Sequence, residues 1–145
     1  MARHLKVVAR EQCIGCFSCM FACSRTWHGA MTTLKSAIRV KAYTGTEATF
    51  SIRACRACPD PDCVAACPTG ALAQKKSGAL HLAREKCNRC GACVEACLFG
   101  ALAWDEGDKM PLPCSHCGVC VRYCPNQVLA MVEREESHVD ARSRG

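Results

Sequence analysis

Short apolar runs separated by turn-forming residues recur along this chain, and they predict strands rather than long helices. Three pairs of such runs flank a polar turn and predict hairpins: 38–43 with 48–53, 71–74 with 79–82, and 101–104 with 109–112. The expected turns lie at 44–46, 75–78 and 105–108, and each contains a glycine. Two single runs, 5–9 and 128–132, lie near the ends of the chain and are positioned to pair as terminal strands.

Membrane and export signals are not visible in the pattern. No apolar run approaches the roughly 18 residues of a transmembrane helix. The first ten residues hold neither the apolar stretch of a signal peptide nor a twin arginine. The chain is therefore expected to be cytoplasmic and to lack a membrane span. The tail, 133–145, is mostly charged, and we expect it to be disordered or to become ordered only on a partner.

The composition leaves little material for an apolar core. Leu, Ile, Val and Phe supply only 26 of the 145 residues, which is fewer than a globular chain usually contains. Sixteen residues are cysteine, a share typical of disulfide or metal scaffolds. Since a cytoplasmic chain keeps its thiols reduced, we expect the cysteines to bind metal and to replace the missing core. The length fits one domain or two very small ones.

The cysteines fall into four groups of four, numbered I to IV along the chain, and none is left over. Groups I, III and IV have the spacing C-x2-C-x2-C-x3-C, whereas group II has C-x2-C-x4-C-x3-C with two prolines in the wider gap. The members are Cys13, Cys16, Cys19 and Cys23 (I); Cys55, Cys58, Cys63 and Cys67 (II); Cys87, Cys90, Cys93 and Cys97 (III); Cys114, Cys117, Cys120 and Cys124 (IV).

This spacing is typical of iron–sulfur ligation. A C-x2-C-x2-C loop can curl so that three thiolates face one 4Fe-4S cubane, and the fourth cysteine, on a short helix, ligates the neighbouring cubane. Four groups predict four 4Fe-4S clusters. Gly15, Gly91 and Gly118 lie inside the loops, where we expect backbone N–H groups to approach cluster sulfurs. Structural zinc, which usually binds two separated C-x2-C pairs, and a disulfide framework are the less favoured alternatives.

At these residues the chain resembles the bacterial-type two-cluster ferredoxin, present twice. It more closely resembles the four-cluster electron-transfer subunits of molybdenum and tungsten pterin oxidoreductases, above all the small iron–sulfur subunit of tungsten-dependent aldehyde oxidoreductase. The runs from Cys13 to Cys23 and from Cys55 to Pro68, with its widened Pro-containing gap, carry the resemblance, which covers about residues 5–132. The compact group IV and the short chain depart from the larger members of that family.

The resemblance implies an α+β fold in which one dicluster ferredoxin module, with pseudo-twofold repeats, is inserted in another. The outer module would comprise 1–40 and 105–132 with groups I and IV, and the inner module 41–104 with groups II and III. The implied ligand sets are Cys13, Cys16, Cys19 with Cys124; Cys114, Cys117, Cys120 with Cys23; Cys55, Cys58, Cys63 with Cys97; and Cys87, Cys90, Cys93 with Cys67. Sequential pairing, I with II and III with IV, is the alternative.

The resemblance also implies a function. The chain would carry single electrons between the catalytic subunit of a tungsten or molybdenum pterin aldehyde oxidoreductase and a flavin/NAD subunit or a soluble ferredoxin. Alternatives are the equivalent subunit of a hydrogenase, a formate or CO dehydrogenase or a benzoyl-CoA reductase-type complex, a free polyferredoxin, and a zinc-based interaction module. Because every cysteine serves as a ligand, no iron is left open for substrate and no catalytic residue is predicted. Self-stacking into a longer cluster chain is a further expectation.

The net charge of +6 could suggest nucleic acid, but Lys and Arg are scattered and form no basic block. Each oxidised cubane with its four thiolates carries a charge of about −2, so the basic residues are expected to compensate the clusters. The candidates beside the motifs are Arg25, Arg56, Arg89 and Arg122. We expect His28 and His116 to be exposed or hydrogen-bonded, and Trp27, Trp104 and Tyr123 to pack over clusters and exclude water.

Overall fold

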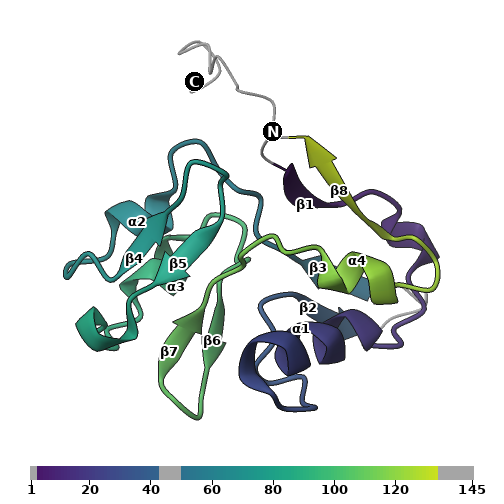
Figure 1. Ribbon diagram of the computed structural model, residues 1–145, viewed down its shortest axis with the longest axis horizontal. Helices are drawn as coiled ribbons and strands as arrows, with labels where there is room; N and C mark the ends of the chain where they lie inside the picture. Colours follow the sequence, from purple (N-terminus) through teal and green to yellow (C-terminus); the bar gives the residue numbers. More distant parts are fainter. Residues whose placement is uncertain (1–2, 43–49, 134–145) are drawn as a thin grey trace.

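The computed structural model describes residues 3–42 and 50–133. In that part of the chain it contains short helices and short strands, labelled in Figure 1. They are β1 (Arg3–Val7), α1 (Ser18–His28), β2 (Arg39–Ala42), β3 (Phe50–Arg53), α2 (Asp62–Ala65), β4 (Leu72–Gln74), β5 (Leu80–Leu82), α3 (Ala92–Ala96), β6 (Ala103–Asp105), β7 (Met110–Leu112), α4 (Val119–Tyr123) and β8 (Leu129–Glu133). Single 3₁₀ turns lie at Arg10–Gln12 and Arg84–Lys86.

The strands form four separate antiparallel pairs: β1 with β8, β2 with β3, β4 with β5, and β6 with β7. The three predicted hairpins and the terminal pair are thus confirmed, whereas the turn predicted at 44–46 lies outside the described residues. The pair β1–β8 joins the two ends of the chain, with Arg3 opposite Glu133 and Val7 opposite Leu129. Two-stranded sheets of this length are marginal by themselves, so each pair depends on what packs against it.

Most strand boundaries differ from the sequence prediction by one or two residues, and two of these differences have identifiable reasons. Strand β6 starts at Ala103, two residues late, and it includes Asp105, because the Asp105 carboxylate accepts a hydrogen bond from the Gly107 N–H (2.9 Å) and closes the turn from the strand end. Strand β1 ends at Val7 rather than residue 9. Beyond Val7 the N–H groups of Val8 and Ala9 both donate to the Val128 carbonyl (2.8 and 3.2 Å), which ends the regular ladder.

The elements gather in two lobes that lie side by side in Figure 1. The terminal lobe, which we define as the described residues among 3–54 together with 114–133, contains β1, β2, β3, β8, α1 and α4. The central lobe, residues 55–113, contains α2, α3 and the strands β4 to β7. Helix α1 packs against α4 in the first lobe, and α2 packs against α3 in the second.

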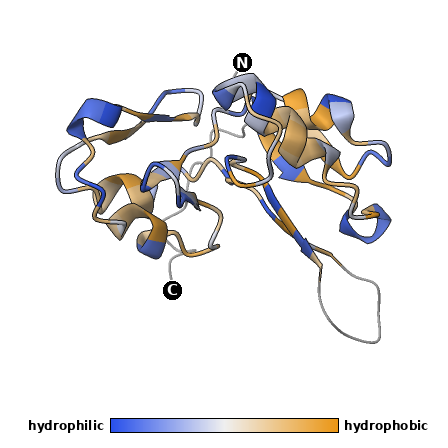
Figure 2. Ribbon diagram, turned by 90° about the horizontal axis from the view of Figure 1, so that it is seen from below, coloured by the Kyte–Doolittle hydropathy of each residue, from blue (hydrophilic) through white to orange (hydrophobic). Residues whose placement is uncertain are grey.

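Each lobe has its own core. The terminal core consists of Leu5, Met20, Ile38, Val40, Ile52, Cys120, Val128 and Leu129. The central core consists of Cys63, Leu72, Leu80, Cys93 and Leu102. In Figure 2 the lobes again lie apart, and each contains its own hydrophobic segments. Cysteines of groups I and IV belong to or border the first core, and cysteines of groups II and III belong to or border the second.

The expected module boundaries, 40/41 and 104/105, both fall inside hairpins. The first lies within β2, which pairs with β3, and the buried side chains of Val40 and Ile52 from these two strands belong to the terminal core. The second lies within β6, whose partner β7 stands in the central lobe. Because a hairpin is held by its own cross-strand hydrogen bonds, each of these two hairpins lies entirely within one lobe. The chain passes from one lobe to the other near residues 54–55 and 113–114 instead.

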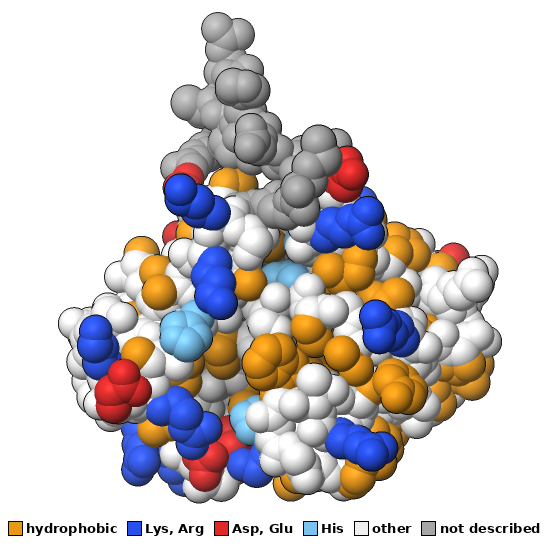
Figure 3. Space-filling model, in the orientation of Figure 1, with side chains coloured by type: hydrophobic (Ala, Val, Ile, Leu, Met, Phe, Trp, Pro, Cys, Tyr) orange, Lys and Arg blue, Asp and Glu red, His pale blue; other side chains and the backbone are white. Residues whose placement is uncertain are grey.

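Within the described ranges, no helix is both long and apolar enough to cross a bilayer. On the face drawn in Figure 3, the Lys and Arg side chains form separate spots rather than a continuous stripe. Hydrophobic side chains lie between these spots and gather over the terminal lobe.

Candidate functional site

The four cysteine groups share one backbone conformation at the start of each loop. The residue before the second cysteine has a positive φ in every group: Gly15 (68°), Ala57 (50°), Arg89 (62°) and His116 (56°). Only the first of these is a glycine, and the others are strained L-residues. The same left-handed step in four places curls each loop in the same sense. The groups are therefore repeats in three dimensions as well as in spacing.

A second left-handed step follows in groups I, III and IV but not in group II. Phe17, Gly91 and Gly118 have φ values of 60°, 75° and 81°, and each starts the helix that carries the third cysteine. In group II the corresponding position is Pro59, whose ring fixes φ near −65°. The two extra residues of the wider gap let Pro61 (φ −74°) start helix α2 from an extended conformation instead.

Backbone conformation and packing give reasons for the loop glycines, and their expected approach to cluster sulfurs stays a prediction. At Gly15 an added Cβ would overlap the ring of Phe50, and at Gly118 it would stand 3.2 Å from the Met131 side chain. At Gly91 nothing lies within 4 Å of the added atom. The requirement common to the three is the positive φ, with close packing against β3 or β8 added in group I and group IV.

The fourth cysteine of each group accepts hydrogen bonds from backbone N–H groups. The donors are Ala101 to Cys97 (3.3 Å), Val128 to Cys124 (3.3 Å) and Ala37 to Cys23 (3.4 Å). In groups III and IV the donor lies four residues after the cysteine. In group I helix α1 continues to His28, so the donor comes from a later segment. Such N–H donors stabilise thiolate ligands of metal sites.

Cys67, the fourth cysteine of group II, also accepts hydrogen bonds, and these lower its pKa. Burial raises the pKa of Cys67, but hydrogen bonds from the Leu72 backbone and from the Thr69 side chain and backbone more than offset it, and the pKa falls to about 7. Cys67 is therefore an accessible thiolate close to neutral pH. The Thr69 hydroxyl lies 3.7 Å from its sulfur.

Three of the four implied ligand sets line a common space. Cys13, Cys16, Cys19 and Cys124 surround a cavity of about 20 Å³. Cys55, Cys58, Cys63 and Cys97 surround one of about 30 Å³, which Cys114 also touches. Cys23, Cys114, Cys117 and Cys120 line one part of a larger cleft of about 450 Å³. Each of these sets combines three cysteines of one group with the fourth cysteine of another.

In the fourth implied set, which consists of Cys87, Cys90, Cys93 and Cys67, the proximity of only two members is apparent, namely Cys93 and Cys67. Burial, first, and then the charge of nearby Cys67 and Cys63 raise the pKa of Cys93 to about 11. This links group III to group II, as the implied set requires. Of the other two members, Cys87 is half-buried and Cys90 is exposed.

Burial and mutual repulsion raise the pKa of several clustered thiols. Burial is the largest cause at Cys19 and Cys120, whose pKa values rise to about 12, and at Cys55, whose pKa rises to about 11. Neighbouring cysteines add to it: Cys124 raises the pKa of Cys19, and Cys97 raises that of Cys55. Buried thiolates this close destabilise one another unless a cation neutralises them. Metal binding at these sites therefore releases protons.

These observations fit the cofactor that the spacing predicts. A cubane needs four thiolates from two loops around one space, with N–H donors to the sulfurs, and three sets supply both. No group of three or more His, Cys, Asp or Glu in residues 3–42 and 50–133 is arranged around a position for a single metal ion. The sites also have a solvent side, because the second cysteines Cys16, Cys90 and Cys117 are exposed.

Two of the three aromatic side chains beside the cysteine motifs are exposed, and the third is half-buried. Trp27 and Tyr123 are 54% and 59% exposed, and their packing over clusters stays a prediction. Trp27 donates its indole N–H to the Cys117 sulfur at 3.4 Å, a contact across 90 residues that the sequence does not reveal. Trp104 is half-buried in β6.

The candidate histidines are buried or half-buried, and the candidate arginines lie at the surface. His116 is buried and its Nδ1 accepts a hydrogen bond from the Leu5 N–H (3.0 Å), which confirms the hydrogen-bonded alternative. His28 is half-buried, and burial together with Lys35 lowers its pKa. Arg56 stacks 3.8 Å over the Phe99 ring beside the cavity of groups II and III. The other candidate arginines are exposed: Arg25, Arg89 and Arg122.

Comparison with known proteins agrees with the 4Fe-4S ligation that this geometry supports. The family described as the 4Fe-4S dicluster domain matches residues 46–134, and the chain belongs to this family. The chain is 34% identical over 110 residues to the beta subunit of NADH-dependent phenylglyoxylate dehydrogenase from Aromatoleum evansii, an alignment that covers 73% of this chain and 25% of that protein.

Two further relatives are components of other oxidoreductases. One subunit of the tetrathionate reductase of Archaeoglobus fulgidus is 34% identical over 68% of this chain and 47% of its own length. The polyferredoxin-like subunit of the aliphatic sulfonate oxidoreductase of Pyrococcus furiosus is 40% identical over 63% and 52%. The matches thus span a quarter to about half the length of these relatives. The chain belongs with electron-transfer subunits of oxidoreductases rather than with catalytic ones.

Proposed function

We propose that this chain carries single electrons along four 4Fe-4S clusters between the catalytic subunit of a pterin oxidoreductase and an electron acceptor. The observation that carries the proposal is the fourfold repeat: all four cysteine groups share the left-handed step before the second cysteine, and the groups meet in cross-paired sets. A chain with one dicluster unit would need only two such groups. The count of four clusters follows from four groups with no cysteine left over.

The proposed ligand sets are nested. Groups I and IV would hold two clusters in the terminal lobe, and groups II and III two clusters in the central lobe. The separate cores of the lobes support this division, because each core adjoins cysteines of the two groups assigned to it. The helix pairs α1–α4 and α2–α3 support it as well. The insertion is then the central lobe, residues 55–113, rather than the range 41–104.

The chain's own residues would bind the clusters, compensate their charge and connect them to the surface. Thiolates supply the ligands, and backbone N–H groups such as those of Ala37, Ala101 and Val128 compensate their charge. A bound 4Fe-4S cluster supplies reversible one-electron transfer. The exposed cysteines Cys16, Cys90 and Cys117 give an electron short routes to the surface. With all sixteen cysteines used as ligands, no metal position is left open, so substrate chemistry belongs to a partner.

We further propose a tungsten or molybdenum pterin aldehyde oxidoreductase as the catalytic partner and a flavin subunit or soluble ferredoxin as the acceptor. The motifs of groups I and II support this partner through their resemblance to the subunits of that class. The named relatives act on phenylglyoxylate, tetrathionate and aliphatic sulfonates, so an oxidoreductase of another substrate is the second candidate. Self-stacking, a cytoplasmic location and an interaction role for the tail 133–145 complete the proposal; nucleic acid and membrane are not among the proposed partners.

The first test is the native mass and metal content of the complex, purified without oxygen from its own source. We expect about sixteen iron atoms and sixteen sulfides per chain, together with a pterin-containing subunit. Zinc without iron would establish the interaction-module alternative. A chain that elutes alone with its clusters would establish a free polyferredoxin, and one copy per complex would exclude self-stacking.

The second test separates nested from sequential pairing by counting clusters in double variants. Under nested pairing Cys23→Ala with Cys114→Ala removes ligands from one cluster, whereas Cys23→Ala with Cys55→Ala removes ligands from two. Sequential pairing reverses these counts, because Cys23 would then share a cluster with Cys55. Iron per chain and EPR spin count give the answer, and each single variant serves as the control.

A further inference from the structure

A cleft of about 450 Å³ lies between the two lobes and is lined from both sides. Leu5, Trp27 and Lys35 line it from the terminal lobe, and Leu80 and Asp105 line it from the central lobe. The four-cysteine cavities of 20 and 30 Å³ show how little space a cluster site leaves in this fold. The cluster site of Cys23, Cys114, Cys117 and Cys120 therefore accounts for only part of this volume, and the rest separates the lobes.

The chain crosses between the lobes at two nearby places. Residue 54 leads to Cys55, and residue 113 leads to Cys114. These two cysteines lie close enough for the charge of Cys55 to raise the pKa of Cys114, which burial has already raised. A hydrogen bond from the Leu80 N–H to the Cys114 carbonyl (3.1 Å) reinforces the same junction. Connections grouped at one junction leave rotation of one lobe against the other unopposed.

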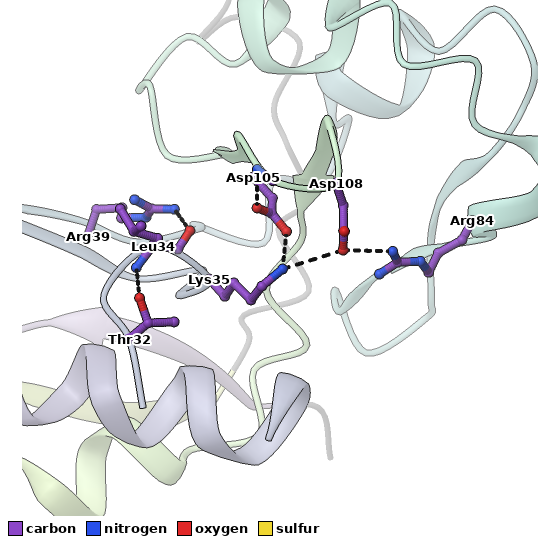
Figure 4. Close-up of polar contacts among 8 residues, drawn as sticks. Thr32, Leu34, Lys35, Arg39, Arg84, Asp105 and Asp108 are labelled. Carbon is purple, nitrogen blue, oxygen red and sulfur yellow. Dashed lines mark hydrogen bonds and ion pairs between the residues drawn. The ribbon is translucent and has the colours of Figure 1, made fainter. Parts of the chain in front are cut away.

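A half-buried ion pair spans the cleft and opposes that rotation. Lys35 Nζ of the terminal lobe lies 2.7 Å from Asp105 Oδ2 at the end of β6 in the central lobe (Figure 4). The Asp105 side chain is only 4% exposed and the Lys35 side chain 28% exposed. Salt screens a pair with one buried member less than a fully exposed pair. Loss of Lys35 would leave the buried Asp105 carboxylate without its cation, whereas surface pairs contribute little.

Both members of the pair are held in place before they meet. The other oxygen of Asp105 accepts the Gly107 N–H at 2.9 Å. On the terminal side, the backbone on both sides of Lys35 is tied to Arg39, whose guanidinium donates to the Leu34 carbonyl (2.7 Å) and the Ser36 carbonyl (2.8 Å). In Figure 4 the Lys35 and Asp105 side chains point toward each other, and Arg39 lies beside Leu34, away from the ion pair. Preorganised partners lose little conformational entropy when they pair.

The pair extends into a short network on the central lobe. Lys35 Nζ also lies 3.4 Å from Asp108 Oδ2, which accepts a hydrogen bond from Arg84 at 2.9 Å. The Asp108 side chain is 42% exposed and the Arg84 side chain 54%. These outer contacts are screened, so the pair of Lys35 with Asp105 is the principal link.

We propose that Lys35 and Asp105 form a clasp that holds the two lobes in the relative position required for electrons to pass between them. The inference rests on the proposed function, since it concerns the step between the cluster at Cys55, Cys58, Cys63 and Cys97 and the cluster at Cys23, Cys114, Cys117 and Cys120. Both residues are positioning residues: they touch no cluster ligand and act through the placement of the lobes.

The test uses the reconstituted full-length holoprotein. Asp105→Asn keeps the shape and the Gly107 hydrogen bond but removes the charge, and Lys35→Met removes the cation while keeping an apolar stem. Lys35→Arg retains a cation and is the rescue variant. The matched control is Lys109→Met, which breaks the exposed pair of Lys109 with Glu106 (3.0 Å) on the same hairpin without involving the other lobe. Iron and sulfide per chain are measured first, so that only proteins with four clusters are compared.

Two readouts report the position of the lobes. In the fully reduced state, EPR measures the magnetic coupling between neighbouring paramagnetic clusters, and hydrogen exchange follows the Leu80 amide that bonds across the junction. We expect Asp105→Asn and Lys35→Met to lose the defined coupling across the junction and to exchange faster at Leu80. Lys35→Arg and Lys109→Met should match the unsubstituted protein in both measurements.

Unchanged coupling and unchanged Leu80 exchange in Asp105→Asn and Lys35→Met, each with four clusters, would overturn the clasp. Loss of iron in both variants would overturn it as well, because the pair would then be needed to retain clusters rather than to place them. An unsubstituted protein without four clusters would instead overturn the proposed function, so the two failures are distinguishable.

Discussion

The terminal and central lobes carry equivalent cysteine groups but have different supporting structure. The core of the terminal lobe contains eight buried residues, of which Cys120 is the one cysteine. The core of the central lobe contains five, and two of them, Cys63 and Cys93, are cysteines, so three leucines provide the rest. The terminal lobe also has an eleven-residue helix, α1, and a pair of five-residue strands. The helices of the central lobe have four and five residues and its strands three.

This difference shows two ways of supporting the same kind of site. Burial of apolar surface contributes to the stability of the terminal lobe independently of any cofactor. The three core leucines, with buried Met110 and Leu112 of β7, cannot offset the conformational entropy of ordering 59 residues of the central lobe, from 55 to 113. The central lobe must therefore obtain most of its stability from its clusters, and the terminal lobe only part. Four predictions test this contrast, beginning with the largest expected effect.

Removal of iron under reducing conditions should unfold the central lobe completely and the terminal lobe incompletely. Structural metal sites contribute on the order of 10 kcal/mol to folding, and the central lobe has few buried apolar side chains to replace that contribution. Hydrogen exchange of the apoprotein measures this directly: amides of β4 and β5 should lose all protection, whereas some protection should persist in the pair β1–β8. Reconstitution with iron and sulfide is the control, and it should restore both. Equal protection in the two lobes of the apoprotein would contradict the contrast.

Truncation of one buried leucine in each lobe should have unequal consequences. Leu72 and Leu5 are 2% and 3% exposed, and loss of such a side chain costs about 2 to 5 kcal/mol. Because the central core has so few members, Leu72→Ala should release iron at a lower denaturant concentration than Leu5→Ala. The bleaching of cluster absorbance during denaturant titration measures the difference. If Leu5→Ala proved the more damaging, the ranking of the cores would be wrong.

A comparison of two glycines separates backbone strain from packing. Gly15 and Gly70 have nearly the same φ, 68° and 69°, but only at Gly15 would a Cβ overlap a side chain, that of Phe50. Gly70→Ala should cost about 1 kcal/mol for the left-handed backbone alone. Gly15→Ala should cost more, about 2 to 3 kcal/mol, because strain and overlap add. Thermal unfolding of the two holoproteins gives the comparison, and equal losses would show that the Phe50 ring moves aside without cost.

The smallest expected effect is at Trp27. Trp27→Phe keeps the aromatic ring but removes the N–H that donates to Cys117. Loss of a hydrogen bond worth about 1 kcal/mol corresponds to roughly 40 mV for a one-electron couple, and the potential should become more negative because the donor stabilises the more highly charged reduced state. An EPR-monitored redox titration should show this shift for one cluster and no change for the others. Tyr123→Phe, at another exposed aromatic, is the control.

Much of the fold could be predicted because its signals are local. The hairpin formed by β4 and β5 follows from apolar runs around a glycine-containing turn, and the pairing of β1 with β8 follows from two apolar runs at the ends. The extension of β6 to Asp105 could not be predicted, since it depends on where the Asp105 carboxylate finds a donor. The positive φ of Ala57 and Arg89 was hidden for a related reason: these residues do not favour that conformation, and the loop imposes it.

The candidate site likewise has some features that the sequence predicts and others that only the tertiary structure decides. Cysteine spacing by itself determines the number of groups, and it predicts the kind of cofactor and the roles of the third and fourth cysteines, because the ligand geometry of a cubane allows few loops. Only the tertiary structure decides which groups share a core, that Trp27 reaches Cys117, and that Lys35 meets Asp105 across the cleft. Those contacts join residues 70 or more positions apart. Packing of the two lobes selects them, and no local pattern in the chain encodes a contact made across such a distance.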